Sequence, residues 1–103
     1  MYGGRSQKDE EEHVKFQKSQ AMAAAVMYKA LSHPIRIWIV QQLAKEEHCV
    51  REFVESLDVE FATVSRHLAK LRQAQILTGQ RRGREVWYGL NRETMRGMLA
   101  ALV

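Results

Sequence analysis

The chain has 103 residues, 46% of them hydrophobic and 27% charged, a composition typical of one globular domain and not of a disordered or fibrous protein. It holds one cysteine, which excludes an intramolecular disulfide and is typical of a reducing compartment. No apolar run approaches the roughly 20 residues of a membrane-spanning helix, and the polar beginning does not look like a secretory signal peptide. We therefore expect a cytoplasmic protein without a membrane partner.

The charge is distributed unevenly along the chain. Residues 1–60 carry eight Lys or Arg against ten Asp or Glu, whereas residues 61–92 carry seven against one. A basic segment that follows a mildly acidic body is typical of a surface that faces phosphates. A solvated charged face is the alternative interpretation.

The beginning of the chain divides into a polar stretch and an alanine-rich one. Residues 1–12 (MYGGRSQKDEEE) have almost no apolar content, which predicts a flexible N-terminal arm in front of one domain over residues 13–103. From about Val14 to Leu31 the composition favours a long helix. Its AMAAAVM stretch is apolar on more than one side, so we expect the helix to need two partners, one of them in a second subunit.

A break at Ser32-His33-Pro34 separates this helix from the next. Proline is tolerated at the first position of a helix and disfavoured inside one, so a second helix should begin at Pro34 and continue through IRIWIVQQLAK. Two shorter helical segments follow, about Val50–Ser56 and Phe61–Gln75, and only LDVE separates them. Two helices joined by so short a turn predict a helix-turn-helix.

The hydrophobic period changes after this motif. Ile76–Gln80 and Glu85–Leu90 contain β-branched and aromatic residues, and the RRGR between them supplies a glycine for a tight reversal. These features predict a two-stranded β-hairpin, and Arg92–Leu102 follows as a last helix. The expected fold is therefore mainly α with a small β-hairpin, a winged helix-turn-helix of about five helices.

The second helix of a helix-turn-helix enters the major groove of DNA, with its N-terminal residues nearest the base edges. Here Val64, Leu68 and Leu71 recur at i, i+4 and i+7, which predicts that they face the core. Thr63 and Arg66 then point away from the core, and Arg66 can donate two parallel hydrogen bonds to a guanine. The candidate DNA-binding residues of this helix are Phe61, Thr63, Ser65, Arg66, His67 and Lys70. His67 lies at the edge of the core face, so packing between helices is equally open for it.

The hairpin adds three candidate DNA-binding residues at its tip, Arg81, Arg82 and Arg84. Winged proteins lay this hairpin along the minor groove or the backbone of DNA, where arginine gains from the negative potential. A turn that only increases solubility is the alternative. Trp87 and Tyr88 lie on the return strand, where alternation predicts that one faces the core and the other the far side of the sheet.

Residues 30–90 resemble the arsenic-repressor (ArsR/SmtB-type) family of bacterial and archaeal transcription regulators. The matching features are ALSHPIR at the second helix, TVSRHLAKLR in the recognition helix, and the arginine-rich wing that ends in VWYGL. The resemblance implies a homodimeric repressor that binds double-stranded DNA at an inverted-repeat operator. Similar family members also carry His at the place of His67. Glu60 departs from the family, which often has Ser at this position as the helix N-cap. Glutamate is a poor N-cap by comparison.

The family dimerises through its first and last helices, which in this chain are rich in methionine. The residues that this resemblance assigns to a dimer interface are Met22, Val26, Met95, Met98, Leu99 and Leu102. Methionine packs adaptably, so these side chains fit a core equally well. A domain of this size would struggle to cover two such helices, and a two-fold symmetric operator requires two copies of its reader.

The only cysteine lies in the stretch EHCVREF. Arsenic sensors of the family use two or three thiolates near this position, but here Arg51 stands where a second thiol would be. Cys49 and His48 are too few ligands for a tight metal site, so we expect no metal and no cofactor. A redox-responsive thiol stays open, and a half-buried cysteine that packs as a small hydrophobe is favoured. The sequence does not identify the effector, whether a small molecule or a redox signal.

Two classes of function are compatible with these sequence features. The first is a DNA-binding transcriptional repressor, and the second is a winged-helix protein-interaction module without sequence-specific DNA binding. The arginines of the hairpin favour the first. An enzyme is not expected, because the sequence contains no recognisable nucleophile–base pair, glycine-rich phosphate loop or metal triad.

Overall fold

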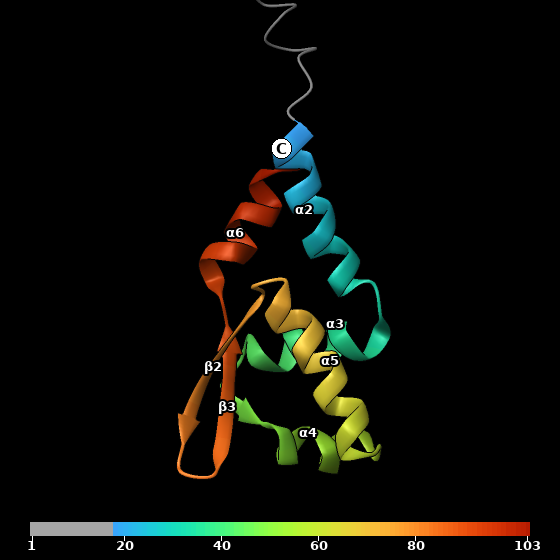
Figure 1. Ribbon diagram of the computed structural model, residues 1–103, viewed down its shortest axis with the longest axis vertical. Helices are drawn as coiled ribbons and strands as arrows, with labels where there is room; N and C mark the ends of the chain where they lie inside the picture. The colour runs from blue at the N-terminus through green and yellow to red at the C-terminus, as the bar shows by residue number, and fades with distance from the viewer. Residues whose placement is uncertain (1–17) are drawn as a thin grey trace, which may run out of the picture.

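The computed structural model describes residues 18–103, which form five α-helices and a three-stranded antiparallel sheet (Figure 1). They run in the order α2 (Lys18–Leu31), α3 (Pro34–Leu43), β1 (His48–Cys49), α4 (Val50–Leu57), α5 (Phe61–Gln73), β2 (Leu77–Arg82), β3 (Glu85–Leu90) and α6 (Arg92–Ala100). The expected fold, mainly α with a small β wing, is confirmed. The predicted arm over residues 1–12 and the beginning of the first predicted helix lie outside the described residues.

The second helix begins where the sequence predicts. Pro34 occupies its first turn, and His33 in front of it adopts an extended backbone whose side chain accepts a hydrogen bond from the Ile35 amide at 3.1 Å. This side-chain bond satisfies one of the amides that the start of a helix leaves free.

None of the helices in residues 18–103 combines the length and the apolar composition that crossing a membrane requires.

The helix-turn-helix is formed by α4 and α5. Asp58 ends α4 in a left-handed conformation with φ of 52°. Glu60 is the N-cap of α5 and makes no side-chain capping bond there, as expected for a glutamate. The recognition helix ends at Gln73 and not at the predicted Gln75, because Gln75 has φ of 62°, which a helix cannot accommodate.

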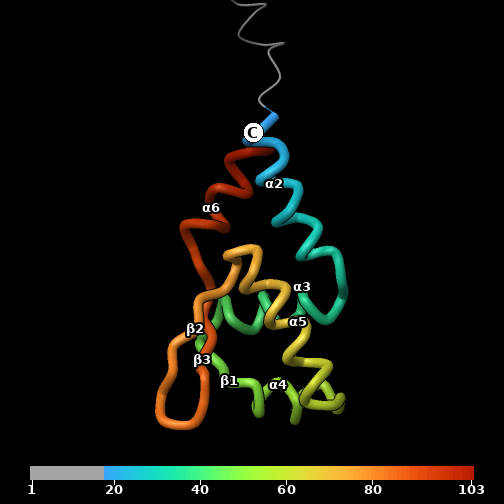
Figure 2. Tube along the Cα trace, viewed as in Figure 1, coloured from blue at the N-terminus to red at the C-terminus, as the bar shows by residue number. Residues whose placement is uncertain are grey.

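The predicted two-stranded hairpin is present, and the sheet contains one further strand, β1, that the sequence did not predict. Strand β1 pairs antiparallel with β3, placing His48 opposite Tyr88 and Cys49 opposite Trp87, and the strand order is β1-β3-β2. In Figure 2 this short segment lies beside the hairpin and leads directly into α4. The wing is therefore attached by backbone hydrogen bonds to the start of the helix-turn-helix.

Strand β3 has its predicted bounds, whereas β2 extends two residues further toward the tip than expected. The turn contains Gly83 at φ of +66°, a conformation that favours glycine. Tyr88 packs against the core, while the Arg82 guanidinium lies 5.6 Å from the centre of the Trp87 ring on the other face. The predicted alternation of these two aromatic residues is confirmed.

The core lies between the helix-turn-helix, α3 and the sheet. Val64, Leu68 and Leu71 are fully buried, as their spacing predicts, and Ile39 and Phe53 complete the packing from α3 and α4. Burial of such side chains is the main stabilising contribution to a domain of this size. The recognition helix is thereby fixed along one face, and its opposite face is left to solvent.

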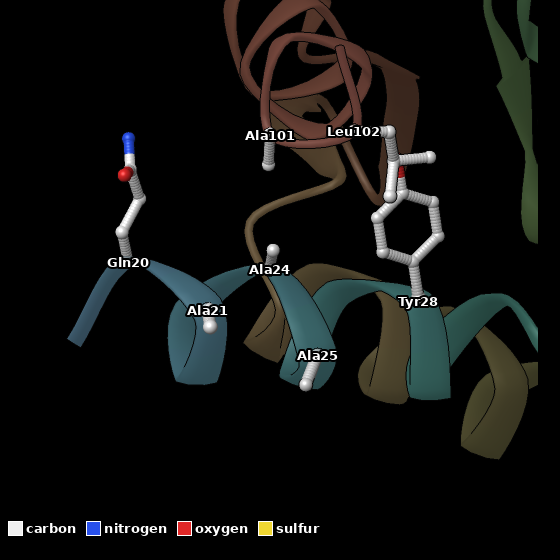
Figure 3. A pocket seen from close by; sticks show the side chains of 7 residues that line it. All are labelled: Gln20, Ala21, Ala24, Ala25, Tyr28, Ala101 and Leu102. Atoms are coloured by element: carbon white, nitrogen blue, oxygen red, sulfur yellow. The ribbon is translucent and has the colours of Figure 1, made fainter. Parts of the chain in front are cut away.

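Helices α2 and α6 lie together at one end of the molecule, and the hairpin tip and α4 lie at the other (Figure 1). The Tyr28 hydroxyl of α2 donates a hydrogen bond to the carbonyl of Met98 in the last turn of α6. Between the helices is a hollow of about 390 Å³, into which Tyr28 points (Figure 3) and which Leu102 and several alanines also line.

The assignment of Met98 to a dimer interface requires a correction. Its side chain is only 2% exposed and belongs to the core of this chain, and Met95 is partly buried against the same core. The other four predicted interface residues remain largely exposed: Met22, Val26, Leu99 and Leu102. The last helix thus divides its apolar residues between its own core and its outer surface.

Candidate nucleic-acid interface

The N-terminal end of α5 and the hairpin tip, which are separated in sequence, face a common groove. Phe61 and Ser65 of the recognition helix and Arg84 of the hairpin line it, together with Cys49 and Arg51. Its volume is about 510 Å³. The two predicted DNA-binding elements are therefore neighbours at one end of the molecule.

The predicted contacts on α5 differ in exposure. Phe61 is 61% exposed, although a large aromatic side chain usually packs inside. Arg66 and Lys70 are exposed, and Thr63 and Ser65 are half-buried. Arg66 Nη2 lies 3.4 Å from the Thr63 hydroxyl oxygen, so these two side chains meet on one face of the helix. This face is opposite the buried stripe, as the spacing predicts.

His67 packs against another histidine. Its ring centre lies 4.4 Å from that of His33, the residue that caps α3. Burial lowers the pKa of His67, and the nearby His33, Arg36 and Arg66 lower it further. The lowered pKa favours the neutral form of the imidazole. This geometry favours the packing interpretation, and a DNA contact by His67 remains a prediction.

The three hairpin arginines have different surroundings. Arg82 Nη2 lies 2.8 Å from a Glu47 carboxylate oxygen and 3.0 Å from the Gln80 side-chain oxygen, and its guanidinium stacks on Trp87. Arg81 and Arg84 are exposed and have no ion-pair partner among the residues that the structure describes. They are thus free to meet a phosphate, whereas Arg82 is held against its own protein.

A second ion pair also joins the wing to the helix-turn-helix. Arg51 Nη2 of α4 lies 3.4 Å from a Glu85 carboxylate oxygen at the start of β3. Sequence reasoning identified neither this pair nor the one between Glu47 and Arg82. Partners 34 and 35 residues apart share no periodicity that a sequence could reveal.

Cys49 is buried rather than half-buried, with 1% of its surface exposed, which corrects the expectation. Burial raises the pKa of its thiol, and a hydrogen bond with the Glu85 carboxylate raises it further. The residue is the N-cap of α4, and its amide donates to the Glu52 carboxylate at 3.2 Å. A thiol with a raised pKa and little access to solvent is unreactive.

His48 is within hydrogen-bond distance of the same Glu52 oxygen, which lies 3.3 Å from its Nδ1 atom. Within residues 18–103 no three His, Cys, Asp or Glu side chains gather in a way that could hold a metal ion. That Cys49 and His48 form no metal site therefore stays a prediction for the whole chain.

Comparison with known proteins points to one family. The model for "bacterial regulatory protein, arsR family" matches residues 33–78. The chain is 47% identical over 68 residues to the HTH-type transcriptional repressor SmtB of Mycobacterium tuberculosis, covering 66% of this chain and 50% of that protein. It is 33% identical over 79 residues to the transcriptional repressor PagR of Bacillus anthracis, covering 76% and 79%. It thus spans about half the length of the first of these relatives.

The fold is also shared with solved structures. NolR from Sinorhizobium fredii superposes with a TM-score of 0.66 at 27% identity, covering 95% of this chain and 90% of that one. HlyU from Vibrio cholerae superposes with a TM-score of 0.70 at 25% identity, covering 82% and 94%. The matched relatives are regulators of transcription and not enzymes. The sequence, the fold and these relatives agree that the chain belongs to the ArsR family of bacterial regulatory proteins.

Proposed function

We propose that this protein is a homodimeric transcriptional repressor that binds double-stranded DNA in a sequence-specific manner. One observation carries the proposal: Phe61 and Ser65 at the N-terminal end of α5 and Arg84 of the hairpin, which has no ion-pair partner among residues 18–103, line one groove at the same end of the molecule. A reading helix beside a cationic wing is the arrangement with which winged helices bind duplex DNA. Relatives described as repressors support the same conclusion.

In this mechanism the recognition helix enters the major groove. Arg66 donates two hydrogen bonds to a guanine, and Thr63 and Ser65 contact base edges or phosphates nearby. Phe61 offers an exposed apolar surface to a thymine methyl group. Arg81 and Arg84 lie along the backbone or in the minor groove and contribute affinity that does not depend on sequence.

The dimer forms through the outer faces of α2 and α6. Met22, Val26, Leu99 and Leu102 are each at least 58% exposed there, and a cluster of large exposed apolar side chains is typical of an interface. The hollow of about 390 Å³ between the helices offers room for side chains of a second copy. Two copies related by a two-fold axis would read the two halves of an inverted-repeat operator.

Such a regulator acts in the cytoplasm without a cofactor. A buried Cys49 with a raised pKa does not support thiol-based sensing. With one thiol and one histidine side by side, we also expect no release of DNA by Zn(II), Cd(II) or As(III). The effector is therefore better sought among ligands that bind elsewhere in the protein.

The decisive experiment selects duplexes from a random library and then compares the selected and random duplexes by fluorescence anisotropy. We expect Arg66→Ala to weaken binding to the selected site by about 1–3 kcal/mol more than binding to random duplex. Lys18→Ala, which removes an exposed cation at the start of α2, serves as the control and should change neither.

Two outcomes would contradict the proposal. If no duplex is enriched and binding is insensitive to salt, the protein is an interaction module of the same fold. If Arg66→Ala weakens both duplexes by the same factor, Arg66 contacts a phosphate and does not read a base.

A further inference from the structure

A second pocket lies away from the hairpin, where α2, α3 and α5 meet. Its volume is about 510 Å³, within the range of small-molecule sites. The residues that line it are Val26, Lys29, Ala30, Ser32, Arg36, Lys70, Gln73 and Ala74. Three of these carry a permanent or nearly permanent positive charge at pH 7. Within residues 18–103 no Asp or Glu contributes to the lining.

One of the three cations has an unsatisfied donor. The Nε atom of Arg36 is buried and has no hydrogen-bond partner among the described residues. Buried donors of this kind are uncommon in native proteins and are explained by strain, by a functional role, or by a water or an ion. The guanidinium also carries a charge, which makes an unpaired donor more costly than a neutral one.

The neighbourhood of Arg36 is positive as a whole. His67 packs against His33 nearby, and Arg36 and His33 both contribute to lowering the pKa of His67 after burial itself. Burial is the main cause of the lowered pKa of His67, and the neighbouring positive charges add to it. Arg36 takes part in no ion pair among residues 18–103.

We propose that this pocket binds a small organic anion, a carboxylate or phosphate attached to an apolar group. Arg36 would pair with the anionic group through its guanidinium, and Lys29 and Lys70 would add positive charge to the same pocket. The methyl groups of Ala30 and Ala74 and the side chain of Val26 provide walls for the apolar part. A metal cation would be repelled by these three positive side chains, and a neutral molecule would leave their charge uncompensated.

The position of the pocket suggests what the anion does, and this step rests on the proposed function. Lys70 belongs to the recognition helix, and Val26 belongs to the proposed dimer surface. A bound anion would neutralise Lys70 and hold α2 against α5. We therefore expect the anion and DNA to weaken each other's binding, and linkage requires the two effects to be equal.

The test uses the free protein, so its result does not depend on DNA binding. A 1H–15N NMR titration compares benzoate, its neutral analogue benzamide and inorganic phosphate. Benzoate should cause saturable shifts of the Arg36 Nε–H signal and of the Ala30 and Ala74 amides, benzamide should not, and phosphate should bind more weakly. Lys29→Gln should weaken benzoate binding about fivefold, whereas Lys45→Gln, at an exposed lysine outside the pocket, should not.

Several results would overturn the proposal. Absence of saturable benzoate shifts, equal effects of benzoate and benzamide, or equal binding by Lys29→Gln and Lys45→Gln would each do so. If phosphate binds more tightly than benzoate, the ligand is not an organic anion. If random duplex DNA shifts the Arg36 Nε–H signal and benzoate does not, the pocket receives a phosphate of the DNA backbone.

Discussion

Arg81 and Arg82 are adjacent in the sequence but point to opposite faces of β2, because successive side chains of a strand alternate. Arg82 stacks on Trp87 and pairs with Glu47, whereas Arg81 has no such partner among residues 18–103. A phosphate would therefore have to compete with Glu47 for one arginine but not for the other. The sequence pattern does not distinguish these two arginines, whereas their contacts in the structure differ.

This difference predicts the effect of removing the competing carboxylate. Glu47→Gln should release Arg82 to a phosphate and so tighten binding to random duplex. Each additional phosphate contact steepens the slope of log K against log salt by roughly 0.9. Anisotropy titrations over a series of KCl concentrations measure this slope.

Glu55→Gln is the matched control, because Glu55 is an exposed glutamate of α4 that takes part in no ion pair of the described residues. A general loss of negative charge would change both variants alike. Equal slopes for the two variants would mean that Arg82 gains nothing when Glu47 is neutralised, and its role would then be to hold the wing in place.

At the scale of elements, the sequence predicted most of what depends on local patterns. Pro34 fixed the start of α3, the spacing of Val64, Leu68 and Leu71 identified the buried face of α5, and the aromatic residues gave the bounds of β3. Strand β1 was missed because two residues have no period, and its pairing with β3 spans about 40 positions of the sequence. In the candidate nucleic-acid interface, the sequence predicted the exposed face of α5 but not the ion pairs of the wing.

The start of the recognition helix offers a prediction of stability. Glu60 is the N-cap of α5 and makes no capping bond with its side chain. Glu60→Asp keeps the negative charge beside the helix N-terminus but shortens the side chain so that its oxygen reaches the free amides. We expect the free energy of unfolding to rise by about 1 kcal/mol.

Urea denaturation followed by circular dichroism measures this change. Glu55→Asp makes the same substitution inside α4, where no free amide awaits a cap, and should not stabilise the protein. A Glu60→Asp variant no more stable than the parent would mean that other groups already satisfy the amides of the first turn of α5.

At the scale of the whole molecule, the two ends differ in chemistry. The end with the hairpin tip and α4 presents the exposed Arg81 and Arg84, and the end with α2 and α6 presents large apolar side chains (Figure 1). In the proposed function, this separation would let one surface associate with a second copy while the other stays open to a duplex. The proposed anion pocket lies where α2, α3 and α5 meet, away from the hairpin.

The apolar end can be tested by introducing a charge. Leu99 is 66% exposed on α6, so Leu99→Glu should leave the fold intact and disrupt the proposed dimer. We expect the dimer dissociation constant to rise at least about tenfold, or ~1.4 kcal/mol, in analytical ultracentrifugation. Ile37→Glu is the control, because Ile37 is 46% exposed but lies on α3.

The dimer proposal fails if the parent protein sediments as a monomer at micromolar concentration. It also fails if Ile37→Glu dissociates the dimer as readily as Leu99→Glu, because the interface would then involve α3. Circular dichroism of each variant establishes that the fold has been retained.

The hydrogen bond from the Tyr28 hydroxyl to the Met98 carbonyl has a consequence for the rate at which the proposed dimer would form. It holds α2 to the last turn of α6 within a single chain, so the proposed dimer surface would be preorganised before a partner binds. A surface of this kind loses little conformational entropy on binding, and association should proceed without a preceding folding step. Newly made subunits would then pair at a rate that their concentration sets.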